Sequence, residues 1–203
     1  MKLLNKLCSF KIALVYFCFF YLNFYSQCNI SESVNLNITR AKVNYCIPEN
    51  YFCINPPDTY FDISPEVHQS EFYLAMMNRE NQIMICIATV PYPKGITKAE
   101  QYLIANVDLN HISKKALAQE MDTNLSKLRF IKTNYLKKIN ADRGYIYNIK
   151  VRKQLYLGIY PRCKKIELYK DNISRAEILF FYKYGQDDIV KQEIEKTWGM
   201  LKF

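Results

Sequence analysis

Histidines and carboxylates are the first side chains to examine for catalytic or metal-binding chemistry in this chain of 203 residues. Its two histidines, His68 and His111, have no second histidine or cysteine at the spacing that zinc ligands share. Asp58, Asp62 and Glu66 lie close together near a proline-rich turn, but their spacing does not match a calcium-binding loop. We interpret the histidines as surface or turn residues and the carboxylates as turn residues, so we expect no metal site.

The sequence also lacks the motifs that identify common enzyme classes. It contains neither a glycine-rich phosphate-binding loop nor a Gly-x-Ser-x-Gly nucleophile elbow. No pair of carboxylates and no nucleophile with a neighbouring base stands out. The sequence therefore predicts a protein that is not an enzyme and that holds no cofactor.

Cysteines offer a second kind of chemistry, because five of them follow the first 27 residues: Cys28, Cys46, Cys53, Cys86 and Cys163. In an oxidising compartment Cys46 and Cys53 could pair and close the segment between them. Cys86 lies within an almost continuously apolar run, which predicts a small, buried and unreactive residue. The odd number leaves at least one cysteine free.

Tyrosines and basic residues near position 156 form the candidate binding site. Tyr156 and Tyr160 alternate with the apolar residues of the 155–159 stretch, so in a strand they point to the opposite face. Together with Lys153 and Arg162 they would form an aromatic, basic patch of the kind that is enriched at protein interfaces. The alternative is that a helix covers this face and that the tyrosines are packing residues.

The N-terminal segment predicts export. Residues 1–27 contain three lysines followed by an apolar run that is too short to span a membrane comfortably, which is typical of a cleavable signal peptide. A lipid anchor on Cys28 is a second option, although Gln27 is larger than the residue that usually precedes a lipidated cysteine. Residues 28–44 are polar and aperiodic, so we expect a flexible tail there.

Residues 45–203 are expected to form one domain of alternating strands and helices. A proline-rich edge strand opens it, and a turn over 140–144 contains Gly144, which permits a positive φ. A capping box at Thr97 begins a helical region that ends near residue 124. The expected strands lie at 71–77, 82–90, 128–139, 144–152, 155–169 and 176–184.

A terminal helix should cover the sheet. After an acidic N-cap, Val190, Ile194, Trp198 and Leu201 recur at steps of four, four and three, which places them on one face. We therefore expect Trp198 to be buried on that face of the helix. Strands and helices that are segregated in this way predict an α+β domain in which an antiparallel sheet is covered by helices.

The order of these elements resembles the Mog1/PsbP-like family of α/β/α sandwich proteins. The features that carry the resemblance are the opening at 47–52 with two prolines at 56–57, the hairpin at 71–90, the helix after Thr97, the strand at 145–151, and a last strand that leads into a closing helix. The resemblance implies a non-enzymatic accessory protein, an adaptor or assembly factor, and transfers no catalytic residue.

Charge and export together suggest where the protein works. The net charge of +9 is modest and scattered, so we interpret most basic residues as solvated surface and expect no nucleic-acid partner. The resulting hypothesis is an exported, periplasmic or envelope-associated accessory protein that binds a protein partner. An inhibitor-like immunity protein, and a small hydrolase or carbohydrate-active domain with an unrecognised site, remain as alternatives.

Overall fold

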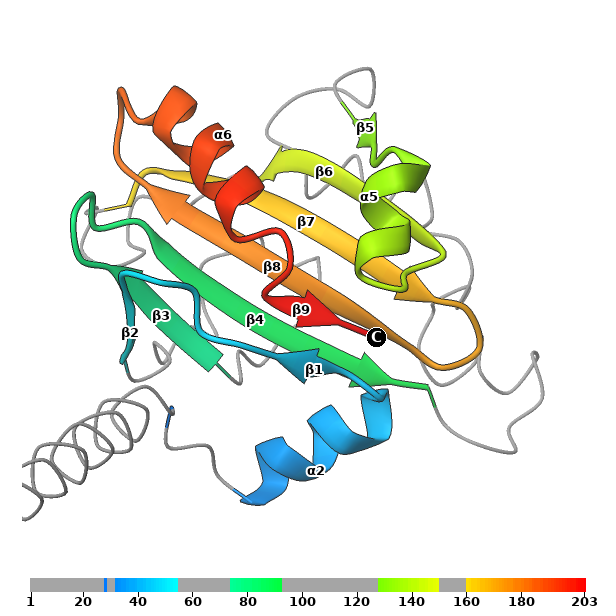
Figure 1. Ribbon diagram of the computed structural model, residues 1–203. Coiled ribbons are helices and arrows are strands. Elements are labelled where there is room, and N and C mark those ends of the chain that lie inside the picture. The colour runs from blue at the N-terminus through cyan, green and yellow to red at the C-terminus, as the bar shows by residue number, and fades with distance from the viewer. Residues whose placement is uncertain (1–27, 29–31, 55–73, 93–127, 150–159) are drawn as a thin grey trace, which may run out of the picture.

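A seven-stranded antiparallel sheet forms the centre of the protein, with the strand order β2-β3-β4-β8-β7-β6-β5 (Figure 1). The computed structural model describes residue 28 and residues 32–54, 74–92, 128–149 and 160–203. The strands of the sheet are β2 (Tyr51–Ile54), β3 (Leu74–Asn78), β4 (Met84–Pro91), β5 (Arg129–Phe130), β6 (Arg143–Ile149), β7 (Arg162–Lys170) and β8 (Ser174–Tyr182).

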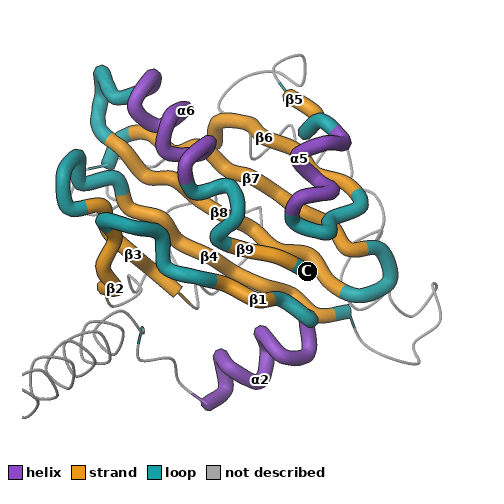
Figure 2. Tube along the Cα trace, viewed as in Figure 1, coloured by secondary structure: helices purple, strands orange, loops and turns teal. Residues whose placement is uncertain are grey.

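Two helices and a small second sheet lie over one face of this sheet (Figures 1 and 2). The helices are α5 (Thr133–Lys138) and α6 (Asp187–Lys196). The second sheet pairs β1 (Asn44–Tyr45) with β9 (Leu201–Lys202), and so joins the two ends of the domain. A further helix, α2 (Glu32–Ala41), packs against β4. The predicted α+β class is therefore confirmed, whereas the helix expected after Thr97 lies outside the described residues.

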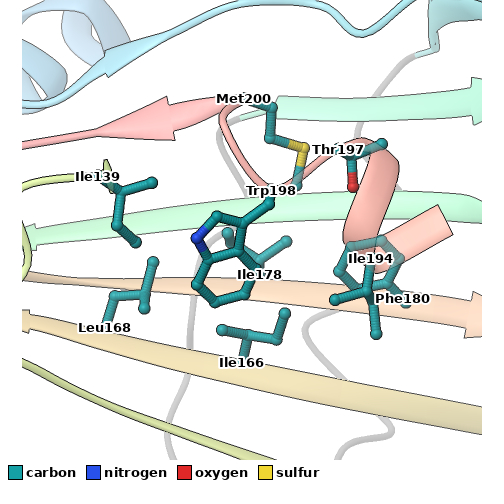
Figure 3. A pocket seen from close by; sticks show the side chains of 9 residues that line it. All are labelled: Ile139, Ile166, Leu168, Ile178, Phe180, Ile194, Thr197, Trp198 and Met200. Atoms are coloured by element: carbon teal, nitrogen blue, oxygen red, sulfur yellow. The ribbon is translucent and has the colours of Figure 1, made fainter. Parts of the chain in front are cut away.

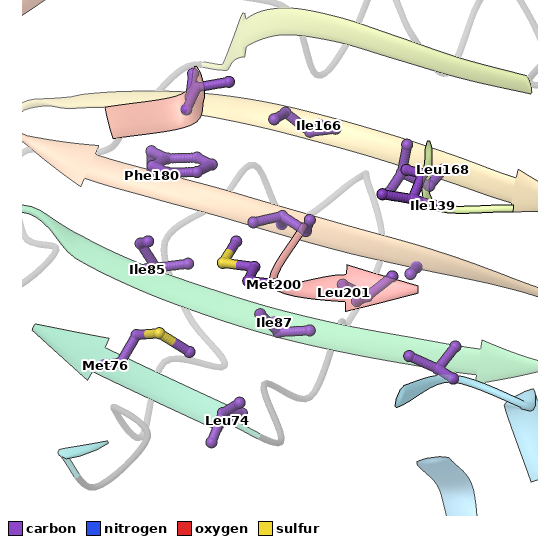
Figure 4. Packing of buried hydrophobic residues seen from close by; sticks show 14 of the residues in the cluster. Leu74, Met76, Ile85, Ile87, Ile139, Ile166, Leu168, Phe180, Met200 and Leu201 are labelled. Carbon is purple, nitrogen blue, oxygen red and sulfur yellow. The ribbon is translucent and has the colours of Figure 1, made fainter. Parts of the chain in front are cut away.

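The strands in the middle of the sheet are buried on both faces, which gives two hydrophobic clusters. On β4, Ile85 and Ile87 belong to the first cluster, while Met84, Cys86 and Ala88 belong to the second. Figure 4 shows part of the first cluster, in which side chains of the sheet lie beneath those of the chain's last residues. This two-sided burial explains why the sequence of β4 is almost continuously apolar.

The predicted hairpin forms between β3 and β4, and Asn78 fixes its turn. The Asn78 side-chain oxygen accepts hydrogen bonds from the backbone N–H groups of Glu80, at 2.8 Å, and Asn81, at 3.1 Å. Gln82 has a φ of 56°, which completes the reversal. An Asx turn of this kind therefore joins the two strands.

Gly144 is needed for a different reason from the one predicted. Asn140 takes the positive φ in this turn, at 56°, and Gly144 lies inside β6. A Cβ atom at Gly144 would lie 2.8 Å from Ile131 Cδ1 and 3.0 Å from Leu168 Cδ2. Close packing of neighbouring side chains, and not backbone conformation, therefore disfavours a larger residue.

The segment 128–139 was expected to be one strand, and that prediction is wrong. Only Arg129 and Phe130 pair with β6, after which the chain turns into α5. Leu136 and Ile139 are buried one helical turn apart and dock this short helix onto the sheet. The spacing of these two anchors favours a helix here over a continued strand.

Residues 28–44 also differ from expectation, because the structure places α2 within the segment that was predicted to be a flexible tail. Ala41 and Val43 are buried, and Ser174 Oγ donates a hydrogen bond to the Ala41 carbonyl oxygen at 2.6 Å. The segment therefore packs against the domain through its C-terminal residues.

The terminal helix is shorter than predicted. It ends at Lys196, so Trp198 lies after the helix and Leu201 lies in β9. The indole is half-buried; it donates a hydrogen bond to the Tyr135 carbonyl oxygen at 3.0 Å and meets the Tyr135 ring edge-on. Trp198 helps to line a small apolar pocket between α6 and the sheet (Figure 3). It therefore joins α5 to the C-terminal segment instead of sitting on the buried face of α6.

Candidate functional site

The predicted tyrosine patch is not assembled on the surface in the part of the chain that the structure describes. Tyr160 is 6% exposed and belongs to the second hydrophobic cluster. Its hydroxyl donates a hydrogen bond to the Gln82 carbonyl oxygen at 3.1 Å, and burial raises the pKa of the phenol. Tyr160 is therefore a packing residue, the alternative that the sequence left open. Lys153 and Tyr156 lie outside the described residues.

Arg162 is half-buried at the start of β7. Its guanidinium lies 3.2 Å from Asp187 Oδ1 and 5.9 Å from the centre of the Tyr182 ring. Burial raises the pKa of Tyr182 to about 12. Arg162 therefore links β7 to the start of α6, and these contacts leave less of its guanidinium available to a binding partner.

The cysteines pair differently from the suggested Cys46–Cys53 bridge. Cys28 is disulfide-bonded to Cys53 on the edge strand β2, and Cys46 is a free, exposed thiol. A lipid anchor on Cys28 would require the same sulfur atom, so the disulfide and the anchor exclude each other. Cys86 is buried as predicted, and burial raises the pKa of its thiol; Cys163 is buried and free as well.

Other candidates from the sequence fall outside the described residues. His68, His111 and the carboxylates at positions 58, 62 and 66 all lie in segments that the structure does not describe. Within the described ranges, no three side chains of the metal-ligating types gather in one place. In the same ranges, no helix is long and apolar enough to cross a membrane.

A row of buried charged residues crosses β7 and β8 on the face of the second cluster. Lys165 Nζ lies 2.9 Å from Glu167 Oε1 and 3.2 Å from Glu177 Oε2, and Arg175 lies 3.2 Å from Glu177 Oε1. The Tyr169 hydroxyl donates to Glu167 Oε2 at 2.9 Å. We call these five residues the ionic row. Two cations balance two anions in it, so the row can remain ionised inside the sheet without a net buried charge.

A second buried carboxylate ties α6 to the edge of the sheet. Glu193 Oε2 accepts hydrogen bonds from the Tyr51 hydroxyl at 2.7 Å and from the Asn78 side chain at 3.2 Å. Lys196 Nζ lies 3.0 Å from the other oxygen of Glu193. Burial, followed by the interaction with Glu193, raises the pKa of Tyr51. The hydrogen bonds from Tyr51 and Asn78 hold β2 and β3 to α6 through this carboxylate, which indicates a structural role.

A group of exposed side chains lies at the far edge of the sheet, on β5 and α5. Phe130 is 74% exposed, and four exposed cations surround it in sequence: Arg129, Lys132, Lys137 and Lys138. We call these five residues the basic edge. Among the described residues, none of the four cations forms an ion pair with a carboxylate. The basic edge therefore presents one large ring and unneutralised positive charge to the solvent.

Local structure explains why the basic edge stays exposed. Leu136 and Ile139 take the buried side of α5, which leaves Lys137 and Lys138 on its outer side. The Phe130 ring rests against Tyr145 of β6, with 5.2 Å between ring centres, and its other side remains uncovered. Sequence reasoning missed this surface because it assigned 128–139 to a single strand. The signal was present as four bases and no acid between residues 128 and 139.

Comparison with known proteins adds a weak structural likeness. No protein-family model and no curated protein matches the sequence. The fold is similar to the solution structure of cyanobacterial PsbP (CyanoP) from Synechocystis sp. PCC 6803, with a TM-score of 0.41 and 8% sequence identity over 80% of this chain and 87% of that one. A likeness at this level supports no statement about function.

Proposed function

We propose that this protein is an exported, non-enzymatic accessory protein of the cell envelope that binds a protein partner through the basic edge. The observation that carries the proposal is Phe130, whose large ring is 74% exposed on a short segment whose four cations have no carboxylate partner in the described structure. Aromatic rings and arginine are enriched at the centres of protein interfaces, where they provide contact area at low entropic cost.

The disulfide supports the exported location. Cys28 directly follows the predicted signal peptide, and its bond to Cys53 fastens the start of the mature chain to β2. Disulfides persist in oxidising compartments outside the cytosol. A periplasmic or envelope location would therefore suit this bond, and the proposed partner would be found there.

The ionic row is better explained as part of the structural scaffold than as a reaction site. Its charged groups are already matched to one another at 2.9–3.2 Å, so they need no substrate to balance them. Arg175 Nε has no hydrogen-bond partner among the described groups.

Capture of the native partner by single-residue variants tests the proposal. Tagged wild-type protein, Phe130→Ser and Tyr184→Ser should be used to recover partners from native envelope extracts. Tyr184 is 73% exposed but lies in the turn before α6, so it is a matched control for loss of an exposed ring. We expect one stoichiometric partner whose recovery falls at least ten-fold, about 1.4 kcal/mol, with Phe130→Ser only. Equal recovery with both variants would place the contact elsewhere.

A further inference from the structure

We infer that the partner presents an acidic, extended protein segment that lies along the basic edge. This inference rests on the proposed function and adds to it the chemistry of the partner. The argument uses the charge of the basic edge, the geometry of β5 and the way in which α5 is anchored.

Charge complementarity points to an acidic partner. The four cations of the basic edge lie on one continuous stretch of chain that contains no acid between residues 128 and 139. Lys164 lies on β7, two strands in from β5, where burial lowers the pKa of its amine, Asp187 raises it, and the positive charge of Arg129 lowers it. Carboxylates placed along the basic edge would relieve this repulsion between like charges.

The edge of the sheet favours an extended segment. β5 is the last strand in the sheet, and no described strand pairs with its outer side. Ile131 donates its backbone N–H to the Gly144 carbonyl oxygen at 3.0 Å, toward β6. Because backbone groups alternate in direction along an antiparallel strand, the N–H and C=O of Phe130 point outward. An extended chain can therefore approach these two groups while its side chains reach the cations.

The anchoring of α5 favours a protein over a lipid surface. A helix that binds a membrane inserts an apolar face, but Leu136 and Ile139 of α5 are buried in the domain. The Tyr135 ring is also occupied, because it packs edge-on against Trp198. Phe130 is then the one large exposed apolar side chain of β5 and α5 that could enter a bilayer. Anionic lipid headgroups could therefore pair with the cations, but a bilayer would bury no large apolar side chain of β5 and α5 other than Phe130.

Binding of a model acidic strand tests the inference directly. The probe is a fluorescently labelled peptide of alternating Glu and Val residues, and a peptide of alternating Lys and Val is the charge control. We expect the full-length oxidised protein to bind the Glu peptide and not the Lys peptide. The dissociation constant should rise at least ten-fold between about 0.1 M and about 1 M salt, because the Debye length falls from about 10 Å to about 3 Å.

Charge reversal on the basic edge should abolish most of this binding. Lys132→Glu/Lys137→Glu places one acid at each end of α5, so the effects on the helix dipole oppose each other. The control Arg40→Glu/Lys183→Glu changes the net charge equally at exposed sites on α2 and after β8. We expect at least ten-fold weaker binding for the first variant and less than two-fold for the control. If the reversal variant does not fold, Lys132→Gln/Lys137→Gln should still weaken binding at least three-fold.

Several outcomes would overturn the inference. The inference is wrong if the wild-type protein does not bind the Glu peptide. It is also wrong if the reversal variant and its control weaken binding of the Glu peptide equally, or if the Gln variant binds this peptide as tightly as the wild type. A membrane would be the partner instead if vesicles of phosphatidylcholine and phosphatidylglycerol, in a three-to-one ratio, bind through the same residues and exclude the peptide. If Phe130→Ser loses the native partner while charge reversal does not, the proposed function stands and the acidic partner is wrong.

Discussion

Lys165 should be the single charge whose removal destabilises the protein most. Its side chain is 2% exposed, and its amine contacts Glu167 and Glu177 at 2.9 Å and 3.2 Å. Lys165→Met keeps the apolar stem but leaves two buried carboxylates with Arg175 as the remaining cation of the ionic row. Removing one partner from a buried ion pair costs about 3–5 kcal/mol, a large part of the 5–15 kcal/mol that is typical of a domain's total stability.

Urea unfolding of the oxidised protein measures this cost. The control is Lys191→Met, because the pair between Lys191 and Asp188 has side chains that are 63% and 87% exposed, so its loss should leave the stability nearly unchanged. Combining Lys165→Met with Glu177→Gln restores equal numbers of cations and anions. The double variant should therefore be at least about 1 kcal/mol more stable than the sum of the two single effects. A loss within about 0.5 kcal/mol for Lys165→Met would show that the ionic row is not buried as described.

Three further predictions test interactions that stabilise other parts of the fold. Cys53→Ser should lose about 3 kcal/mol, because the disulfide to Cys28 closes a loop with a sequence separation of 25; a melting temperature unchanged by reductant would contradict this. Burial alone would raise the pKa of Asp142, but hydrogen bonds from Lys170 and a backbone N–H lower it below its usual value. The stabilisation is thus present above about pH 4 and is lost as the pH falls through the folded pKa of this carboxyl. Asp142→Asn should therefore reduce the pH dependence of unfolding below about pH 4. NMR titration of the Asp142 carboxyl checks the lowered pKa. Trp198→Ala should cost about 2–3 kcal/mol, less than a fully buried aromatic, because the indole is half-buried.

The centre of the sheet could be predicted because its signals are local. The apolar run of β4, the hairpin turn at 78–81 and the strand β8 are each visible in short stretches of sequence. Alternate residues of β6 also lie on opposite faces: Tyr147 and Ile149 belong to the second cluster, and Ile146 packs against the first. Patterns with a period of two are reliable where burial on each face is strong.

The ionic row could not be predicted, because it depends on the register between strands whose residues are distant in sequence. Lys165 and Glu167 look like solvent-facing residues in sequence, and only the pairing of β7 with β8 brings Glu177 opposite Glu167. Tyr160 was assigned to the surface from alternation alone, although the second face of the sheet is also buried. Alternation shows which residues share a face but not whether that face is covered.

Photocrosslinking in the living cell is the most direct test of the claim that the basic edge contacts a partner. A photoreactive amino acid should replace Phe130 in one variant and Tyr184 in another, since the two side chains are almost equally exposed, at 74% and 73%. We predict one discrete protein adduct from position 130 and none of the same size from position 184. A cell envelope in which position 130 gives no protein adduct, or in which both positions give the same adduct, would contradict the account.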